Sequence, residues 1–211
     1  MRKGLFITFE GADGCGKTTQ INLLDEYFRE YKIPTLLTRE PGSRGLGVKL
    51  REILLNYEGE VSPTCESFLF LADRAQHIDC IIKPAMEEGK IVLCDRHIDS
   101  TVAYQGYGRG INLEQIYYLN NLATGGMKPD LTFVFDIDAK IAMKRIGKNQ
   151  DRMEASGIDF FNRVRAGYLE IARKEPERIK VIDSSQSIES VHKKIVEIIK
   201  NEYPRFKNKN K

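Results

Sequence analysis

The chain contains 211 residues, of which 41% are hydrophobic and 30% are charged. This composition excludes a disordered chain, and the longest apolar runs, such as residues 131–135, are too short to span a bilayer. The length suits one domain of ordinary size, so we predict a single domain over residues 1–211. The N-terminus reaches Glu10 before a signal-length apolar segment forms, which favours a cytoplasmic protein.

A net charge of +3 is too small to predict a nucleic-acid partner. The one basic run, residues 205–211, is typical of a solvated chain end. The four cysteines and three histidines are scattered, without the clustered spacing of a zinc site or a C-x-x-C redox pair. We therefore expect no nucleic-acid partner, no membrane partner and no cysteine-based metal or disulfide site.

Short apolar runs alternate with amphipathic helical patterns along the chain. The runs predict strands at residues 5–9, 35–38, 91–94, 131–137 and 179–182. Nearly continuous apolar runs are typical of strands that are covered on both faces. Strands that alternate with helices predict crossover connections, and hence an α/β fold with a parallel sheet between layers of helices. Ligands bind at the carboxyl ends of the strands in such sheets, so functional residues are expected there.

The first predicted strand leads into a loop that fits the phosphate-binding pattern G-x-x-x-x-G-K-[ST] at every fixed position. The loop consists of Gly11, Ala12, Asp13, Gly14, Cys15, Gly16, Lys17 and Thr18. Its glycines let backbone N–H groups approach phosphate oxygens, and an amphipathic helix follows it. Lys17 is expected to contact the β- and γ-phosphates and Thr18 to bind Mg²⁺, which predicts an ATP site.

The second predicted strand is followed by T-R-E-P-G-S, residues 38–43. Pro41 and Gly42 force a turn that leaves Arg39 and Glu40 at the end of the strand. A plain surface turn would need neither charge, so both residues are candidate ligand contacts.

Residues 68–74 predict a helix in which Phe70 and Arg74, four residues apart, share one face. An aromatic ring and a guanidinium in this arrangement can stack on a base and bind its edge. A core phenylalanine beside a surface arginine explains the same spacing, so the pattern alone leaves both interpretations open.

The third predicted strand ends at Asp95, a carboxylate placed to complete a Mg²⁺ site beside the phosphate-binding loop. A turn-forming aspartate is the alternative interpretation. Residues 95–109 hold two arginines, two tyrosines and a glutamine, a density that a solvated loop does not need. They predict the wall of a pocket for a polar, anionic ligand.

The C-terminal half contains a basic segment, K-R-I-G-K-N-Q-D-R at residues 144–152, between the last two predicted strands. Gly147 gives its backbone the freedom that a closing loop needs, although a solvated basic loop is the commoner explanation of such a run. The last helical pattern has Ile188, Val191 and Ile195 on one face, with Ser187 as its expected N-cap.

These motifs, in this order, resemble those of the bacterial thymidylate kinases, which are P-loop nucleoside monophosphate kinases. The family pattern has an acidic residue in the P-loop and then T-R-E-P-G-G, L-F-x-A-D-R and D-R-Y-x-x-S-x-x-A-Y-Q-G. A P-D strand start, a lid with D-R-x-E and a D-F-F-x-R-V-R-x-G-Y-L helix follow; residues 128–130, 151–154 and 159–169 match them. The resemblance covers nearly the whole chain.

The resemblance implies a P-loop NTPase three-layer sandwich with a small mobile lid at about residues 145–154. It also implies the reaction ATP + dTMP ⇌ ADP + dTDP, with Mg²⁺ held by Thr18 and Asp95. Family members are usually homodimers, and we expect a homodimer here, although the sequence does not show an interface.

The resemblance assigns the dTMP site to Asp13, Arg39, Glu40, Pro41, Phe70, Arg74, Arg96, Thr101, Tyr104 and Gln105. Phe70 would stack on thymine, with Arg74 and Gln105 hydrogen-bonded to its edge. Thr101 and Tyr104 would lie near the base and sugar, where Tyr104 would crowd a ribose 2′-hydroxyl.

At the other end of dTMP, Arg39 and Arg96 would line the phosphate group and Asp13 would face the sugar 3′-hydroxyl. The proline of R-E-P is commonly cis in the family, so we predict a cis peptide bond between Glu40 and Pro41.

Three positions depart from the family pattern. His97 replaces the tyrosine of D-R-Y, Ser43 replaces the second glycine of R-E-P-G-G, and Thr101 stands where serine or asparagine is commoner. None of these changes removes a charge, so the predicted activity stands, while the fit around the nucleotide phosphate and sugar can differ. His97 is not expected to act as a base, because the accepting phosphate oxygen is already ionised at neutral pH.

Phosphoryl transfer depends mainly on neutralising the charge of the transferring group. Some thymidylate kinases carry an arginine in the P-loop; this loop has none, and the resemblance points to Arg145, Lys148 and Arg152 in the lid instead. The predicted catalytic residues are therefore Lys17, Arg96, Arg145, Arg152 and Asp13.

The nearest alternative function is that of another nucleoside monophosphate kinase or a deoxynucleoside kinase, for example one that acts on dUMP. A nucleotide-binding switch is disfavoured because no guanine-reading N-K-x-D follows a strand. A nucleic-acid-binding protein has only the basic chain end in its favour.

Overall fold

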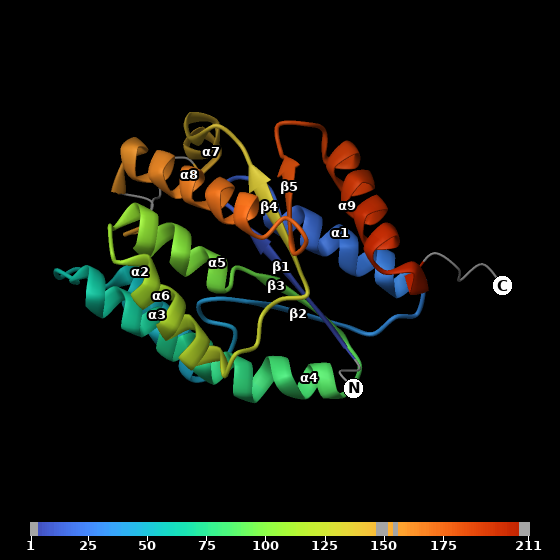
Figure 1. Cartoon of the computed structure of the whole chain (residues 1–211), viewed down its shortest axis with the longest axis horizontal. Helices are drawn as coiled ribbons and strands as arrows, with labels where there is room; N and C mark the ends of the chain where they lie inside the picture. The colour runs from blue at the N-terminus through green and yellow to red at the C-terminus, as the bar shows by residue number, and fades with distance from the viewer. Residues whose placement is uncertain (1–3, 147–151, 154–155, 207–211) are drawn as a thin grey trace.

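The computed structural model describes residues 4–146, 152–153 and 156–206. Its centre is a five-stranded parallel sheet with the strand order β2-β3-β1-β4-β5 (Figure 1). The strands are β1 (Leu5–Glu10), β2 (Thr35–Arg39), β3 (Ile91–Asp95), β4 (Leu131–Asp136) and β5 (Ile179–Asp183). All five predicted strands are confirmed, with boundaries that differ by one residue at the carboxyl ends.

Helices connect the strands and cover the sheet. They are α1 (Lys17–Glu30), α2 (Leu46–Asn56), α3 (Pro63–His77), α4 (Lys83–Glu87), α5 (Ile98–Thr101), α6 (Leu113–Thr124), α7 (Ala139–Ile146), α8 (Ile158–Lys174) and α9 (Ile188–Glu202). Two π-helical turns, η1 (Ile78–Ile82) and η2 (Val102–Gly108), and a final 3₁₀ turn, η4 (Pro204–Phe206), complete the described helical segments. Ser187 caps α9 as predicted, since its hydroxyl accepts a hydrogen bond of 3.2 Å from the backbone N–H of Ser190.

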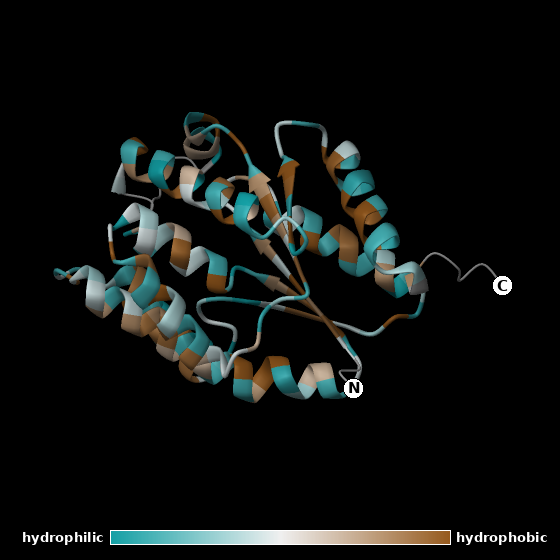
Figure 2. Cartoon of the chain, viewed as in Figure 1, coloured by the Kyte–Doolittle hydropathy of each residue, from teal (hydrophilic) through white to brown (hydrophobic). Residues whose placement is uncertain are grey.

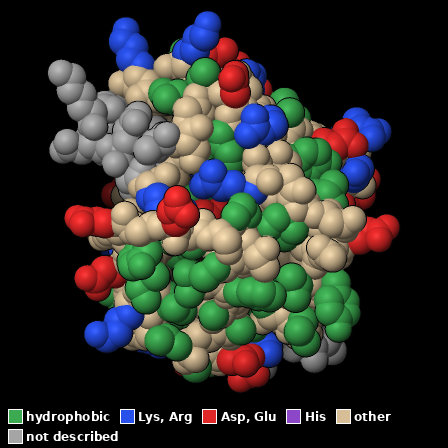
Figure 3. All heavy atoms as spheres, turned by 90° about the vertical axis from the view of Figure 1, so that its left-hand side faces the viewer, with side chains coloured by type: hydrophobic (Ala, Val, Ile, Leu, Met, Phe, Trp, Pro, Cys, Tyr) green, Lys and Arg blue, Asp and Glu red, His purple; other side chains and the backbone are tan. Residues whose placement is uncertain are grey.

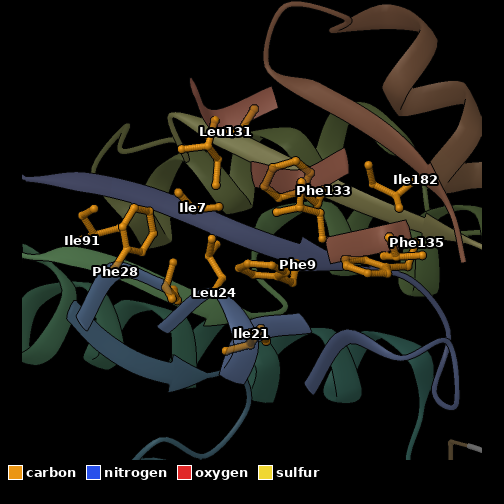
Figure 4. Packing of buried hydrophobic residues seen from close by; sticks show 14 of the residues in the cluster. Ile7, Phe9, Ile21, Leu24, Phe28, Ile91, Leu131, Phe133, Phe135 and Ile182 are labelled. Carbon is orange, nitrogen blue, oxygen red and sulfur yellow. The ribbon is translucent and has the colours of Figure 1, made fainter. Parts of the chain in front are cut away.

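The three-layer arrangement follows from the alternation of side chains along buried strands. Ile7 and Phe9 of β1 join a core cluster with residues of α1 and α9, while Phe6 joins a cluster with residues of η1 and α4 on the other face. Figure 1 shows α1 and α9 on one side of the sheet and α5, α6 and α8 on the other. Figure 4 shows Ile21, Leu24 and Phe28 of α1 packed against strand side chains.

Hydropathy follows the same layers. Along α1 and α9, brown hydrophobic residues alternate with teal hydrophilic ones in stripes, as expected for helices with one buried face (Figure 2). The six residues of β1 are all buried, which explains why its sequence is almost continuously apolar. Two polar residues of these buried strands, Thr8 and Thr132, satisfy each other, because their hydroxyl groups form a hydrogen bond of 2.7 Å.

The parallel sheet places the functional segments together. β1 pairs with β3 so that Phe9 lies opposite Asp95, and β2 pairs with β3 so that Arg39 lies opposite Asp95. The loops after these three strands therefore emerge at one edge of the sheet. They contain the P-loop, the R-E-P turn and the donor-rich segment after Asp95, which lie far apart along the chain.

Candidate active site

The P-loop follows β1 in the conformation that its glycines permit. Gly14 and Gly16 have φ angles of 75° and 96°, and a Cβ at Gly14 would lie 2.5 Å from the carbonyl oxygen of Ala142. The side chain of Lys17 is buried, and its Nζ donates hydrogen bonds of 3.1 Å to the carbonyl oxygens of Gly11 and Ala12. The loop thus has the shape and the cation that a bound phosphate chain requires.

Two oxygen-bearing side chains lie beside Lys17. The Thr18 hydroxyl is 3.5 Å from Oδ2 of Asp95, and Oδ1 of Asp95 is 4.0 Å from Nζ of Lys17. Oδ1 of Asp95 is buried and has no hydrogen-bond partner within the described residues. A hydroxyl and a carboxylate of this kind fit Mg²⁺, which is usually bound by one or two protein oxygens together with substrate phosphates. Among the described residues, no group of three or more His, Cys, Asp or Glu side chains is placed to hold a metal ion.

A cavity opens beside the P-loop at the carboxyl edge of the sheet. Its lining residues are Asp13, Glu40, Pro41, Arg51, Leu55, Phe70, Arg74, Arg96, Ser100, Thr101, Tyr104, Gln105 and Met153. Nine of the ten residues predicted to bind dTMP belong to this lining. The tenth, Arg39, is exposed at the end of β2 and is not part of it. The sequence interpretation missed Arg51, Leu55, Ser100 and Met153, although Ser100 belongs to the S position of the D-R-Y-x-x-S pattern.

Arg74 is a buried residue of the cavity wall, so the interpretation as a surface arginine is wrong. Its Nε donates to Oε2 of Glu40 at 2.9 Å, and its Nη2 donates to the His97 carbonyl oxygen at 2.9 Å. Its Nη1 donates to Oγ1 of Thr101 at 2.7 Å and to Oδ1 of Asn120 at 2.6 Å. These bonds fix the plane of the guanidinium at the edge of the cavity, one helical turn from Phe70.

Glu40 holds together the end of the cavity at which Arg74 lies. Oε1 accepts hydrogen bonds of 2.9 Å from Nδ1 of His77 and from Nδ1 of His97, while Oε2 accepts the bond from Arg74. Burial opposes ionisation of Glu40, but His97, Arg74 and the hydrogen bonds from both imidazoles hold its pKa well below the usual range. The peptide bond between Glu40 and Pro41 is cis, as predicted.

His97 lies behind the cavity wall. Its ring is fully buried, faces Glu40 and packs edge-on against Phe6 with the ring centroids 5.0 Å apart. Burial lowers the pKa of His97 below its usual value, and its neighbour Glu40 only partly offsets this effect. A ring that is buried behind the lining is consistent with the prediction that His97 is not a catalytic base.

Arg96 and Asp13 form an ion pair at the end of the cavity next to the P-loop. Nη2 of Arg96 lies 2.8 Å from Oδ1 of Asp13, and the guanidinium lies 5.0 Å from the centre of the Tyr104 ring. Although burial opposes ionisation, Arg96 and Lys17 lower the pKa of Asp13 to about 2. Asp13 is therefore a carboxylate at neutral pH and can accept a hydrogen bond from a sugar hydroxyl, but it holds no proton to give.

A second cavity lies on the other side of the P-loop. Its lining residues are Gly14, Cys15, Gly16, Thr19, Gln20, Phe135, Arg145, Ser184, Gln186, Ile188 and Val191. The sequence interpretation assigned only the loop residues and Arg145 to the site, and missed Ser184 and Gln186 in the turn after β5. The rule that ligands bind at the carboxyl ends of parallel strands was the available signal for that turn.

The predicted lid, at about residues 145–154, is only partly within the described residues, and Lys148 lies outside them. Arg145 belongs to α7 rather than to a loop, and its Nη1 donates to the Gly14 carbonyl oxygen at 3.3 Å. Arg152 contacts two lining residues of the first cavity, since its backbone N–H donates to the Leu55 carbonyl oxygen at 3.4 Å and its Nη2 lies 3.6 Å from Sδ of Met153. Its Nη1 is also 2.7 Å from Oε2 of Glu66, and its Nε donates to the Leu54 carbonyl oxygen at 2.9 Å. The two arginines therefore lie beside different cavities.

A parallel sheet with a P-loop after its central strand, a cation and a carboxylate beside the loop, and a cavity on each side defines a P-loop nucleotide kinase architecture. A solved structure of the thymidylate kinase from Ehrlichia chaffeensis superposes with a TM-score of 0.78 at 40% sequence identity. The alignment covers 93% of this chain and 98% of that one.

Comparison with known sequences shows to which family of P-loop nucleotide kinases the chain belongs. The thymidylate kinase family model matches residues 9–195. The thymidylate kinase of Sulfurihydrogenibium sp. is 48% identical over 198 residues, which is 93% of this chain and 97% of the relative. That of Thermoanaerobacter pseudethanolicus is 46% identical over 199 residues, 94% of this chain and 98% of the relative. The chain belongs to the thymidylate kinase family, which confirms the resemblance predicted from its motifs.

The Glu40 carboxylate generates a first prediction. Replacing Glu40 with Gln removes the charge that faces the buried Arg74, and breaking a buried pair in this way costs about 3–5 kcal/mol. We expect the dTMP kcat/KM of Glu40→Gln to fall by about 100-fold or more and its thermal midpoint to decrease.

Steady-state kinetics and thermal unfolding check this expectation. Glu52→Gln, which changes an exposed carboxylate of α2, is the matched control and should behave like the wild type. Wild-type dTMP kinetics in Glu40→Gln would show that the carboxylate is not needed to hold Arg74 in place.

Proposed function

We propose that the chain transfers the γ-phosphoryl group of ATP to dTMP in the cleft formed by the two cavities and the P-loop. Membership of the thymidylate kinase family supports this reaction. The observation that carries the assignment of the site is that nine residues with predicted dTMP roles line one cavity beside Lys17. ATP would bind with its phosphates on the P-loop and its remaining part in the second cavity.

The acceptor dTMP would bind with its thymine ring stacked on Phe70. Arg74 and Gln105 would hydrogen-bond to the edge of that ring. The fixed guanidinium of Arg74 presents a donor to a carbonyl oxygen of the base, and Gln105 is held by a 2.9 Å bond from its Nε2 to Oε1 of Glu66. Thr101 and Tyr104 would line the base and sugar. Buried, oriented polar groups of this kind discriminate strongly against bases that leave them unpaired.

The phosphate of dTMP would lie at Arg96, with Arg39 as a further predicted contact and Asp13 at the 3′-hydroxyl. Transfer then runs between two phosphate oxygens, so the residues need only align the groups and neutralise their charge. Lys17 and Arg96 both supply positive charge near Asp13, whose pKa of about 2 keeps it ionised. Mg²⁺ held by Thr18 and Asp95 would add charge at the donor phosphates.

Arg145 and Arg152 are the proposed sources of transition-state charge outside the P-loop. Arg145 already contacts the P-loop at Gly14, whereas Arg152 contacts Glu66 beside the acceptor cavity. We expect Arg145→Ala and Arg152→Ala each to lower kcat by more than tenfold, a change of about 1.4 kcal/mol in the activation free energy. Single-turnover and steady-state rates with saturating ATP and dTMP measure this.

Arg173→Ala, which removes an exposed arginine of α8, is the matched control and should keep the wild-type kcat. Losses below tenfold for both lid-region variants would contradict a catalytic role for these arginines.

Acceptor specificity distinguishes the proposed activity from its nearest alternatives. In a coupled assay over dTMP, dUMP, dCMP, dGMP and thymidine, we expect kcat/KM for dTMP to exceed that for dCMP by more than about 100-fold. Thymidine should not be phosphorylated, and ATP hydrolysis without an acceptor should stay slow. Equal rates with dTMP and dCMP would refute the assignment of a thymine-reading site, and rapid hydrolysis without acceptor would favour a nucleotide switch.

We also propose a homodimer, formed through an exposed apolar surface on α3 and α6. Phe68, Tyr118 and Leu122 are 54%, 68% and 67% exposed, and Phe68 and Tyr118 line one shallow hollow. Figure 3 shows hydrophobic side chains gathered over this side of the molecule. Large exposed apolar patches of this kind mark interaction sites, and the dimer that is usual in the family would cover it.

Light scattering or sedimentation velocity tests the dimer. We expect the wild type to have twice the mass of one chain, and the variant Tyr118→Glu/Leu122→Glu to have the mass of one chain, since charges at an apolar interface are costly to bury. Val181→Glu, at an exposed apolar residue of β5, is the control and should remain dimeric. A wild type with the mass of one chain would contradict the proposal.

The sequence also predicts where the protein is located and which partners it has. None of the described helices has the length and apolar character needed to cross a membrane. We propose a cytoplasmic enzyme that uses ATP, dTMP and Mg²⁺ and has no nucleic-acid partner.

A further inference from the structure

Glu10, the last residue of β1, is a fully buried carboxylate just outside the cavity lining. Its Oε1 accepts a 2.8 Å hydrogen bond from the backbone N–H of His97. Its Oε2 accepts bonds of 2.5 Å from the Ser100 hydroxyl and 3.2 Å from the Tyr168 hydroxyl. The donors come from the turn after β3, from α5 and from α8, so one carboxylate joins three segments behind the phosphate end of the cavity.

Those contacts surround Arg96, whose backbone is in an unfavourable conformation. Arg96 has a φ angle of 70°, in the left-handed region that a residue with a side chain rarely adopts. Such a conformation is unfavourable for a residue with a side chain and persists only where the surroundings fix it. The N–H of Arg96 donates to the Phe9 carbonyl oxygen at 3.0 Å, and the next N–H, that of His97, donates to Glu10. The end of β1 therefore holds both peptide N–H groups that flank the strained residue.

Glu10 also acts on the side chain of Arg96 through two hydroxyl groups. Nη1 of Arg96 lies 3.4 Å from the Ser100 hydroxyl and 3.4 Å from that of Tyr168. An ionised Glu10 accepts the proton of Ser100, and the Tyr168 hydroxyl, 2.8 Å from Ser100 and 3.2 Å from Glu10, donates to one of these two oxygens, so oxygen lone pairs of both hydroxyls are left for Arg96. The guanidinium is then supported on Nη1 while Nη2 pairs with Asp13 at 2.8 Å.

We propose that Glu10 is a positioning residue that holds Arg96 in place and thereby sets the affinity for the acceptor phosphate. The proposal rests on the placement of that phosphate at Arg96 under the proposed function. Glu10 does not touch the acceptor itself; it acts through the His97 amide, Ser100 and Tyr168.

The charge state of Glu10 gives the proposal a signature in pH. Burial and the nearby Asp99 of α5 raise the pKa of Glu10 to about 7, opposed by Ser100, Arg96 and the His97 amide. Asp99 is itself paired with Arg178 by bonds of 2.7 and 2.8 Å, and Tyr168 is the group that faces Glu10 from α8. Glu10 is thus mostly ionised at pH 8.5 and mostly neutral at pH 5.5.

A glutamine at this position mimics the neutral acid at all pH values. Its oxygen can still accept from His97, but its amide group donates and reverses the hydrogen bonds to the two hydroxyls. We therefore expect the dTMP Kd of Glu10→Gln to exceed that of the wild type by about tenfold at pH 8.5, the loss of roughly one charge-assisted hydrogen bond. At pH 5.5 the two values should converge, since the wild type then also carries a neutral group.

Isothermal titration calorimetry with dTMP over this pH range measures the ratio of the two Kd values. Ionisation of the dTMP phosphate affects both proteins equally and cancels in the ratio. The Kd for ATP should change less than twofold. Asp25→Asn, which alters a buried carboxylate of α1 bonded to Thr35 and Arg29, is the matched control and should leave the dTMP Kd unchanged.

The sign of the effect separates positioning from simple charge removal. If Glu10 only repelled the phosphate, its neutralisation would tighten dTMP binding above pH 7, and a Kd ratio at or below one at pH 8.5 would overturn the proposal. A ratio that does not vary with pH, or a matching loss of ATP affinity, would also overturn it by showing a general structural effect.

A double-mutant cycle with Arg96 separates this proposal from the proposed site. Arg96→Ala should weaken dTMP binding strongly, and Glu10→Gln should then have no further effect, because its action passes through Arg96. If Glu10→Gln weakens binding equally in both backgrounds, the positioning role is wrong. If Arg96→Ala itself leaves the dTMP Kd unchanged, the placement of the acceptor phosphate is wrong instead.

Discussion

The pairing of β1 with β3 is the constraint on which the rest of the site depends. Its parallel register sets Phe9 opposite Asp95, so the P-loop and the Asp95-Arg96 turn leave the sheet side by side. Lys17, Thr18 and Asp95 meet for this reason, and Arg96 can donate its N–H to Phe9 while its side chain reaches Asp13. A shift of one residue would turn Asp95 to the other face and displace both Asp95, the proposed metal ligand, and Arg96, the proposed phosphate contact.

Buried charge is concentrated at this edge of the sheet, and the hydrophobic effect does not account for it. Glu10, Glu40 and Glu66 are each at most 3% exposed, and Arg74 is 1% exposed. Buried ion pairs contribute little net stability, because the desolvation of the charges offsets their attraction. Their value here lies in orientation: Glu40 fixes Arg74, and Glu10 fixes the surroundings of Arg96. Arg74 and Arg96, which would contact dTMP, are thereby each oriented by a neighbouring carboxylate.

The sequence predicted the framework of the site well but not the contacts that orient it. Continuous apolar runs identify buried strands, so the strand boundaries were predicted to within one residue. The P-loop could also be predicted, because its glycines fix the conformation of the loop. The partners of Arg74 could not be predicted in this way, because Asn120 lies 46 residues along the chain and meets Arg74 only when α6 packs against α3. Arg39 shows the converse: its motif suggested a ligand contact, yet the side chain is exposed beside the cavity. A motif specifies a residue type, whereas the direction of a side chain depends on packing.

Glu66 shows why such contacts matter when the chemistry is divided among residues. It accepts a bond from Gln105, which would read the base, and also pairs with Arg109 and Arg152. Removing Arg152 leaves a buried carboxylate with fewer cations, and that carboxylate orients Gln105. Under the proposed function, a loss of activity in an Arg152 variant would therefore have two physical sources, lost charge near the transferring group and a displaced base contact. Only the first lowers kcat without raising the KM for dTMP, so the division between these constants shows which role Arg152 has.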